Sequence, residues 1–473
     1  MITTSIFQLF KIGPGPSSSH TVGPMRAMDD FRNRIITFLS TQATTIDPQH
    51  PLLADNLSIR VQLYGSLAAT GLGHGTHRAI LAGLMGEKPH TVDAAKMKKY
   101  WIIPGEQHNI ILGAYEVEFN EDHIIYNYDP HPYRHSNTLK AELVYHHKVI
   151  LEQVYYSVGG GFIETDTYDE PNQKLEAKQL PYPYNSMDEL IAITLNSKLD
   201  IAEILYANEM SISNMDKETI DIKLKEIMQV MRESITRGLN SEGILPGGLG
   251  VARRAKEMYA KAELMESKHQ MGNAMMARLN AYALATSEEN ADGNMVVTAP
   301  TNGAAGIIPA CVEYLMRDCF VPEEKIGRGL LVAAMIGYII KDKASISGAE
   351  LGCQAEVGSA ASMGAALFSY CFDEDIQDIA TSAEIALEHH LGMTCDPVKG
   401  LVQVPCIERN ATGAVKAFNA YLLASDRPGK PIISFDQVVE VMRQTGEDLS
   451  NKYKETALGG LASYFGWGNM PGS

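Results

Sequence analysis

The spacing of apolar residues changes its period about one third of the way along the chain. In the first third, apolar and polar side chains alternate over residues 57–63, 115–119 and, more loosely, 149–155. A period of two predicts β-strands with one buried face. Farther along, apolar residues recur every three or four positions, which predicts amphipathic helices over residues 224–235, 271–284, 376–391, 415–423 and 438–442. A single sheet or a single helical bundle cannot satisfy both periods, so two kinds of structure are expected.

A polar stretch separates the two patterns. Residues 165–186 read TDTYDEPNQKLEAKQLPYPYNS and contain three prolines, a composition typical of a linker. We therefore predict an α+β fold. An N-terminal α/β domain with a small sheet is expected over residues 1–164, its sheet ending near Gly159–Gly161, and a mostly helical domain over residues 187–473.

The composition is that of an ordinary globular protein, with 45% hydrophobic and 21% charged residues in 473. A formal charge of -17 repels phosphate backbones and anionic lipid headgroups, so we expect neither nucleic acid nor a membrane as a partner. The N-terminus lacks the pattern of a secretory signal, and the longest apolar run, residues 330–340, is too short to cross a bilayer. These features predict a cytoplasmic protein.

All six cysteines lie after residue 310, which predicts reduced thiols or metal ligands and argues against a disulfide framework. Cys353, Cys395 and Cys406 stand beside Gly or Pro, so each is expected on a bend. Their spacing matches no zinc-finger or ferredoxin motif, and three ordinary buried cysteines would fit it. Three thiolates without a fourth would equally suit a [4Fe-4S] cluster with one iron open as a Lewis acid. The others lie in apolar helical segments and are interpreted as structural: Cys311, Cys319 and Cys371.

A loop rich in hydroxyl groups lies near the N-terminus. The sequence GPGPSSSHTVGP over residues 13–24 offers hydroxyls and backbone N–H groups to an anion such as a carboxylate. The same pattern would serve as a helix N-cap leading into residues 25–31. The candidate binding residues here are Ser17, Ser18, Ser19, His20 and Thr21.

Two further segments carry histidine. His74 stands between two glycines after a predicted strand, where a ligand could approach the imidazole and use it as a general base or acid. A solvated loop histidine is the alternative interpretation, and both interpretations also apply to His135 and Asn137 in RHSNTL.

A loop of small residues, VVTAPTNGAAG over residues 296–306, lies next to predicted helices. Thr298, Thr301 and Asn302 are candidates to hydrogen-bond a polar ligand, with glycines leaving room for it. A turn between helices without any function would have a similar sequence.

Taken together, these motifs resemble the iron–sulfur L-serine dehydratases (L-serine ammonia-lyases) in their single-chain bacterial form. The likeness covers nearly the whole chain, through SIFQLFKIGPGPSSSHTVGPMRA, LYGSLAATGLGHGT, GILPGGL, VVTAPTNGAAGIIPA, SGAELGCQAEVG, CDPVKGLVQVPCIERN and KYKETALGGLA. In that family an α/β domain precedes a helical catalytic domain. The resemblance implies conversion of L-serine to pyruvate and ammonia without pyridoxal phosphate. Substrate handling across two domains predicts a homodimer.

The resemblance also implies roles for the candidate residues. Cys353, Cys395 and Cys406 would hold a [4Fe-4S] cluster, and His74 would take the α-proton. His135 and Asn137 would face the cluster from the first domain, and the 17–21 and 298–302 segments would hold the substrate carboxylate.

The chain departs from the family pattern at three places. Its C-terminal tail, residues 463–473, lacks the cysteine that the family usually carries there, so the ligand of the open iron is undefined. Lys399 replaces a usual glycine, and His77, interpreted as surface drift, replaces a usual acid. Two rival hypotheses follow. One is a paralogue with the same chemistry on a different β-hydroxy or β-substituted amino acid, and the other is a non-catalytic amino-acid sensor.

Overall fold

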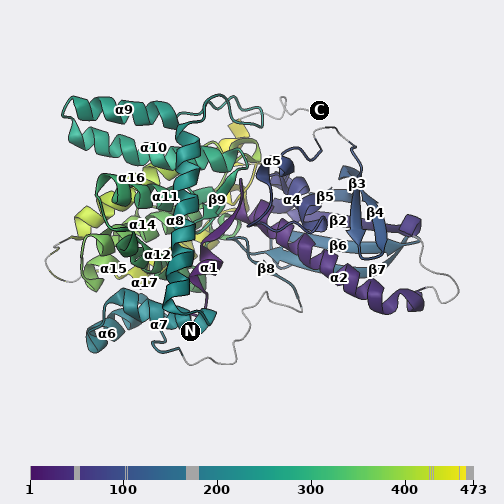
Figure 1. Ribbon diagram of the computed structural model, residues 1–473, viewed down its shortest axis with the longest axis horizontal. Helices are drawn as coiled ribbons and strands as arrows, with labels where there is room; N and C mark the ends of the chain where they lie inside the picture. The colour runs from purple at the N-terminus through teal and green to yellow at the C-terminus, as the bar shows by residue number, and fades with distance from the viewer. Residues whose placement is uncertain are drawn as a thin grey trace.

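The computed structural model describes residues 2–46, 54–101, 103, 105–166, 180–425, 427, 429, 431–457 and 459–464, of which 42–46 and 55 are described by their backbone only. Figure 1 shows a sheet region formed by the first third of the chain beside a helical region formed by the rest. The fold is α+β, as the change of period predicts. None of the described helices is long and apolar enough to cross a membrane.

The main sheet has five strands in the order β5-β2-β6-β7-β8, in which β2 is parallel to β5 and the other pairs are antiparallel. The strands are β2 (Leu57–Gly65), β5 (Ile124–Asn127), β6 (Asn137–Tyr145), β7 (Lys148–Ser157) and β8 (Ile163–Glu164). The predicted strands at 57–63 and 149–155 lie in β2 and β7. β8 follows the glycine run, so the sheet ends just beyond Gly161.

The predicted strand at 115–119 is β4 (Tyr115–Phe119), which pairs with β3 (His108–Leu112) in a separate two-stranded sheet. Helices α2 (Gly23–Ile46) and α4 (Thr76–Leu84) pack together against the main sheet. Two short helices complete the sheet region: α3 (Ser66–Thr70) and α5 (Ala94–Met97).

The helical region contains every helix predicted from periodicity. The predicted segments lie in α8 (Lys217–Leu239), α10 (Met271–Ala291), α15 (Ile376–Glu388), α16 (Cys406–Ala424) and α17 (Phe435–Asp448). Side-chain oxygens cap several N-termini, such as Asp216 on the Thr219 amide of α8. The other helices are α6 (Met187–Ser197), α7 (Ile201–Ser213), α9 (Ala255–Ser267), α11 (Ile307–Glu313), α12 (Glu323–Lys343), α13 (Gly348–Leu351) and α14 (Ser359–Cys371).

The longest apolar run of the sequence, residues 330–340, forms the buried body of α12. This helix packs against α14, α7 and α8. Neighbouring helices cover this part of α12, so its residues are apolar on every face, as expected of a central helix.

The N-terminal segment joins the helical region even though it precedes the sheet. Ile2, Ile6, Leu9 and Phe10 are buried in the core of the helical region, with the last turn of α1 (Ile6–Leu9) beside α12. Strand β1 (Lys11–Pro14) then pairs antiparallel with β9 (Met295–Thr298). The chain therefore enters the sheet region only at α2. The linker prediction at 165–186 stays a prediction, since residues 167–179 lie outside the described residues.

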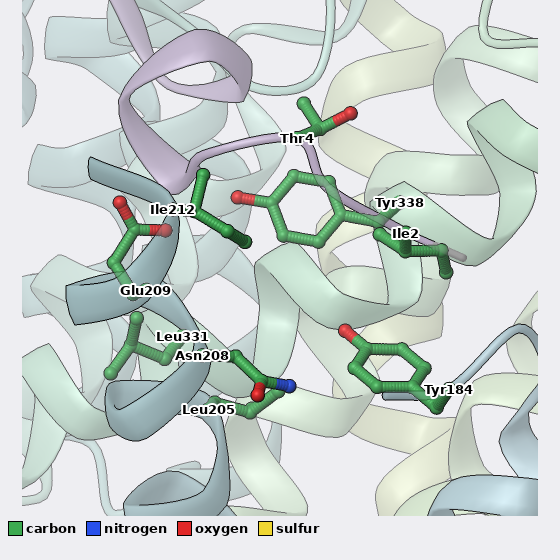
Figure 2. A pocket seen from close by; sticks show the side chains of 9 residues that line it. All are labelled: Ile2, Thr4, Tyr184, Leu205, Asn208, Glu209, Ile212, Leu331 and Tyr338. Carbon is green, nitrogen blue, oxygen red and sulfur yellow. The ribbon is translucent and has the colours of Figure 1, made fainter. Parts of the chain in front are cut away.

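The N-terminal segment closes a small cavity of about 20 Å³ that Ile2, Thr4, Tyr184, Glu209 and Tyr338 help to line (Figure 2). Glu209 accepts hydrogen bonds from the Ser5 hydroxyl at 2.6 Å and the Ile6 amide at 3.0 Å. Burial nevertheless raises the pKa of Glu209 to about 7. The folded protein therefore retains a proton on Glu209 that an unfolded chain releases near the ordinary pKa of 4.5.

We expect this proton to make the N-terminal contact pH-dependent. A raised folded-state pKa stabilises the fold fully below the unfolded pKa, and this contribution is lost as pH rises through about 7. Between pH 5 and 8, Glu209 should reduce the free energy of unfolding by about 2 kcal/mol. The measurement is the difference in unfolding free energy between the wild type and Glu209→Gln at both pH values. A difference that does not change with pH would contradict the assignment.

Candidate active site

A π-helical turn, Ser18–Val22, lies where the sheet region contacts the helical region. We call this contact between the two regions the seam. The Ser17 hydroxyl caps it by accepting a hydrogen bond from the His20 amide at 3.1 Å, and α2 begins directly afterwards at Gly23, so the N-cap interpretation is confirmed. The candidate side chains of the turn are all buried: Ser17, Ser18, Ser19, His20 and Thr21. Among the described residues, no group accepts a hydrogen bond from the Ser18 or Ser19 amide. These two first-turn donors face outward from the helix start and suit an anion.

Two imidazole rings pack against each other here, that of His20 in this turn and that of His74. The ring centroids of His20 and His74 lie 4.5 Å apart with their planes at 30°. His20 Nδ1 lies 2.9 Å from the Ser19 hydroxyl and 3.3 Å from Oε1 of Glu455, and its Nε2 lies 3.1 Å from the Ser66 hydroxyl. His74 is only 2% exposed, so the solvated-loop interpretation of this residue is wrong.

His74 is held as a neutral base. Its Nδ1 lies 2.9 Å from the Thr70 carbonyl oxygen. Because a carbonyl only accepts hydrogen bonds, Nδ1 carries the proton and Nε2 carries the lone pair. Burial, followed by the charge of His20, lowers the pKa of His74 to about 4, although Glu455 acts in the opposite direction. The ring is therefore neutral at neutral pH, with its single proton on Nδ1.

Asn137 is the first residue of the central strand β6, and His135 precedes it in the loop that reaches α13 of the helical region. The Asn137 amide donates to His135 Nδ1 at 2.9 Å, so the proton of a neutral His135 is on Nε2, which lies 3.0 Å from Oε1 of Glu350 in α13. The Asn137 side chain donates to the Ser157 carbonyl at 3.3 Å, while its own Oδ1 is buried and has no hydrogen-bond partner in the described part of the chain. The contact between His135 and Glu350 joins the sheet region to the segment that precedes Cys353.

The 298–302 loop uses most of its polar groups internally. The Thr298 hydroxyl donates to Oδ1 of Asn302 at 2.7 Å, and Nδ2 of Asn302 donates to Oδ1 of Asn290 at 2.9 Å. The Thr301 hydroxyl is buried and has no hydrogen-bond partner within the described ranges. Burial raises the pKa of Glu356, and the Thr301 hydroxyl acts in the opposite direction. Of the three candidates in this loop, Thr301 is therefore the one with bonding capacity left for a ligand.

The three predicted cysteines lie at bends, as their glycine and proline neighbours suggest. Cys353 precedes a π-helical turn (Gln354–Gly358), Cys395 lies in an irregular segment, and Cys406 is the first residue of α16. All three are buried, and all six cysteines of the chain are free thiols.

Glu356 lies close to two of these thiols. Its Oε2 is 3.9 Å from Sγ of Cys353 and 3.8 Å from Sγ of Cys395, and these three ligand atoms lie within 4.8 Å of one another. Cys406 is not part of this group of ligand atoms; it interacts electrostatically with Cys353 and Arg409. Burial lowers the pKa of Arg409, but the thiolates of Cys353, Cys406 and Cys395 outweigh it and raise that pKa overall. Arg409 is held by the Thr394 carbonyl at 2.6 Å.

The protein stabilises one thiolate of this group more readily than three. A hydrogen bond from Cys395 lowers the pKa of Cys353, with further help from Arg409. The Cys353 thiolate and burial then raise the pKa of Cys395 well above its usual range, and burial with the Cys353 charge does the same to Cys406. Ionisation of all three thiols therefore needs added positive charge, which a thiolate-bound metal centre supplies. The donor set fits such a centre.

The remaining cysteines lie in helical settings, as predicted. Cys311 is in α11, Cys371 ends α14, and Cys319 follows a helical turn. Burial raises the pKa of Cys371 to about 12 and that of Cys319 to about 11, and it raises the pKa of Cys311 as well. These thiols are therefore protonated, with Cys311 and Cys371 buried and Cys319 partly exposed.

Comparison with known families assigns both regions. Residues 5–168 match the family described as Serine dehydratase beta chain, and residues 196–462 match Serine dehydratase alpha chain. This chain belongs to the serine dehydratase family. It joins in one polypeptide the beta-chain and alpha-chain regions, in that order.

Curated relatives in the serine dehydratase family match along nearly the whole chain. An L-serine dehydratase of Streptomyces coelicolor is 43% identical over 97% of this chain and 98% of its own length. L-serine dehydratase 2 of Escherichia coli is 42% identical over the same shares, and an L-serine dehydratase of Helicobacter pylori is 38% identical over 98% and 99%.

The departures from the serine dehydratase pattern have distinct settings. Lys399 adopts a left-handed φ of 54°, and its ammonium is directed to the Gly248 carbonyl oxygen at 3.5 Å. His77 stacks on Trp101 with ring centroids 5.8 Å apart, and burial lowers its pKa to about 4. The residue is half-buried. The tail residues 465–473 lie outside the described residues.

Four charged residues of this site were not singled out from the sequence. Glu356 and Arg409 each lie three positions after a candidate cysteine, a spacing that places both side chains on one helical face. Glu350 lies three positions before Cys353, and Glu455 is inside KYKETALGGLA. For Glu350 and Glu356, a charged residue in a segment made mostly of small and apolar residues was the available signal. Arg409 follows Glu408, and Glu455 follows Lys452 and Lys454, so neither stands out from its neighbours.

Gly348 leaves the room that the thiol group requires. A Cβ at this position would lie 2.8 Å from Oε2 of Glu356 and 3.1 Å from Sγ of Cys395. We expect Gly348→Ala to displace Cys395 and to reduce iron retention and activity together, by roughly 10-fold or more for a shift of about 1 Å. Iron content per chain and activity after anaerobic reconstitution measure this. Gly272→Ala, where a Cβ meets nothing within 4 Å, is the control and should retain both.

Proposed function

We propose that this chain is an iron–sulfur L-serine dehydratase that converts L-serine to pyruvate and ammonia. The supporting observation is the meeting of two groups at the seam: the buried thiols of the helical region and the neutral His74 of the sheet region. Glu455 links them, because it affects the pKa of His74 and those of Cys353 and Glu356. Acid and base chemistry can therefore act on one small substrate.

Cys353, Cys395 and Cys406 would hold a [4Fe-4S] cluster. Their burial and their need for positive charge suit it, and Arg409 offsets part of the thiolate charge. When bound, such a cluster supplies a Lewis acid that makes the serine hydroxyl a better leaving group.

His74 is the proposed base for the α-proton. Its lone pair is on Nε2, because Nδ1 is fixed on the Thr70 carbonyl, and its lowered pKa keeps Nε2 free of a proton at neutral pH. Burial of the stacked His20 and His74 rings excludes bulk water, which protects the carbanionic character that develops at the α-carbon.

The substrate carboxylate would bind at the start of the π-helical turn. The Ser18 and Ser19 amides are donors without a described acceptor, and the Thr301 hydroxyl is a third candidate. A helix N-terminus favours a negative group electrostatically. His135 and Asn137 are proposed to line the substrate site from the sheet side, with Oδ1 of Asn137 as a hydrogen-bond acceptor.

The test is anaerobic reconstitution of the full chain with iron and sulfide. We expect a broad visible absorption shoulder, about four irons per chain for a cube-type cluster, and pyruvate with ammonia from L-serine. A chain that binds iron and sulfide but leaves serine unchanged would refute the substrate, and a panel of β-hydroxy amino acids would then test the paralogue. Gel filtration of the same sample tests the predicted homodimer, and fractionation tests the predicted cytoplasmic location.

A further inference from the structure

Glu455 is a buried carboxylate in the seam between the thiols and the imidazoles. It is 5% exposed and follows the short helical turn Asn451–Tyr453. Backbone bonds fix it beside the Cys395 segment: the Cys395 amide donates to the Tyr453 carbonyl at 2.7 Å, and the Thr456 amide donates to the Cys395 carbonyl at 3.2 Å. Glu455 therefore lies between the Cys395 segment and the His20 imidazole.

Only one oxygen of this carboxylate has partners. Oε1 lies 3.2 Å from the Ser19 hydroxyl and 3.3 Å from His20 Nδ1. Oε2 is buried and has no hydrogen-bond partner among the described residues. A buried carboxylate oxygen without a donor is costly, so it indicates a ligand group that the described residues do not supply.

The backbone of Glu455 is also strained. Its φ is 43°, in the left-handed region that side chains other than glycine rarely adopt. Such a conformation costs on the order of 1–3 kcal/mol and is retained mainly where function needs it. The Glu455 carbonyl oxygen accepts a hydrogen bond from the Ser66 hydroxyl at 2.8 Å, which holds the residue in this conformation.

The missing donor matches one part of the proposed substrate. The groups named so far address the carboxylate, the hydroxyl and the α-proton of L-serine, but none addresses its ammonium. The Glu455 carboxyl is ionised at neutral pH, because the charge and hydrogen bond of His20 lower its pKa to about 2 against the effect of burial. A carboxylate is the usual partner of a buried ammonium, and the pair forms a charge-assisted hydrogen bond.

We propose that Oε2 of Glu455 binds the α-ammonium of the amino-acid substrate. This inference rests on the proposed function. Carboxylate recognition at the Ser18 turn and ammonium recognition at Glu455 would fix two substituents of the α-carbon, so that the α-hydrogen has one orientation relative to His74. The site would thereby select amino acids over hydroxy acids of the same size.

The experiment compares two ligands on the reconstituted full-length enzyme. L-serine carries the ammonium, whereas 3-hydroxypropionate has the same carboxylate and hydroxyl but lacks it. The KM for serine and the inhibition constant Ki for 3-hydroxypropionate are measured for the wild type, Glu455→Gln and Glu455→Asp. Glu447→Gln on α17, which removes an exposed carboxylate paired with Arg443, is the control.

Loss of a hydrogen bond to a charged group corresponds to roughly a 10- to 100-fold rise in the KM for serine in Glu455→Gln. The Ki for 3-hydroxypropionate should stay within about 3-fold of the wild type, since that ligand has no ammonium to lose. Glu455→Asp should raise the KM less, and it decides the same comparison if the Gln variant does not load iron. Glu447→Gln should change neither constant.

A merely structural Glu455 would change both constants by the same factor or neither, and either result overturns the inference. A wild type that binds serine without releasing ammonia refutes the proposed function instead. In that case the same comparison is made from equilibrium dissociation constants of the two ligands, so the ammonium site is still tested.

Discussion

Cys395→Ser is expected to abolish activity and most cluster binding. Cys395 lies in an irregular segment held by backbone bonds to Tyr453 and Thr456, and its Sγ is 3.8 Å from Glu356. A serine hydroxyl is a harder and much less acidic ligand than a thiol. We expect activity to fall at least on the order of 10³-fold, the scale of losing electrophilic stabilisation of a leaving group.

Iron and sulfide content with the visible spectrum measure this loss, alongside ammonia release. Cys319→Ser makes the same chemical change in a partly exposed thiol outside the cysteine group and should retain normal iron content and activity. Full activity in Cys395→Ser, with normal iron content, would show that the three thiols are only buried structural residues.

His74→Gln is expected to remove the α-proton base while leaving the substrate and cluster sites intact. Loss of a positioned base lowers kcat by about 10²–10⁴-fold. The KM for serine should change little, because the proposed contacts to the carboxylate come from the Ser18 turn. His389→Gln, which alters an exposed histidine of the helical region, is the matched control and should behave as the wild type.

The pH profile gives a second readout of His74. Protonation occurs only as pH falls toward about 4, because burial and the charge of His20 lower the pKa of this imidazole. The wild-type rate should therefore show no loss from His74 protonation between pH 6 and 8, and a loss should begin only on the far acid side. A rate that halves near pH 6.5, where an unperturbed histidine titrates, would contradict the lowered pKa of His74.

Much of the fold follows from local patterns. The alternation at 57–63 gives a strand whose odd-numbered residues are buried, and the helical spacing at 224–235 gives α8, since burial of one face needs only the correct period. The strand at 115–119 is also present, but its partner could not be inferred. Periodicity states which face of a strand is buried, whereas pairing with β3 depends on the turn between them.

Only part of the candidate site could be predicted from local sequence patterns. The motifs containing His74 and the three cysteines stand out, because imidazoles and thiols next to glycine are chemically conspicuous. Glu455 does not stand out, because its local sequence does not distinguish it from the many other acidic residues of the chain. Its importance comes from its surroundings: it is 436 residues from Ser19 in sequence, yet its carboxylate oxygen lies 3.2 Å from that hydroxyl.

By itself, the sequence determined the two kinds of structure, the reduced state expected of the thiols and the residue types available for elimination chemistry. Only the tertiary structure decided which of those residues meet. It placed the N-terminal segment in the helical core, set the pKa of His74 by burial, used Thr298 and Asn302 internally and left Oε2 of Glu455 without a partner. The physical reason is that period and propensity act over a few residues, whereas desolvation and charge pairing depend on everything packed around a group.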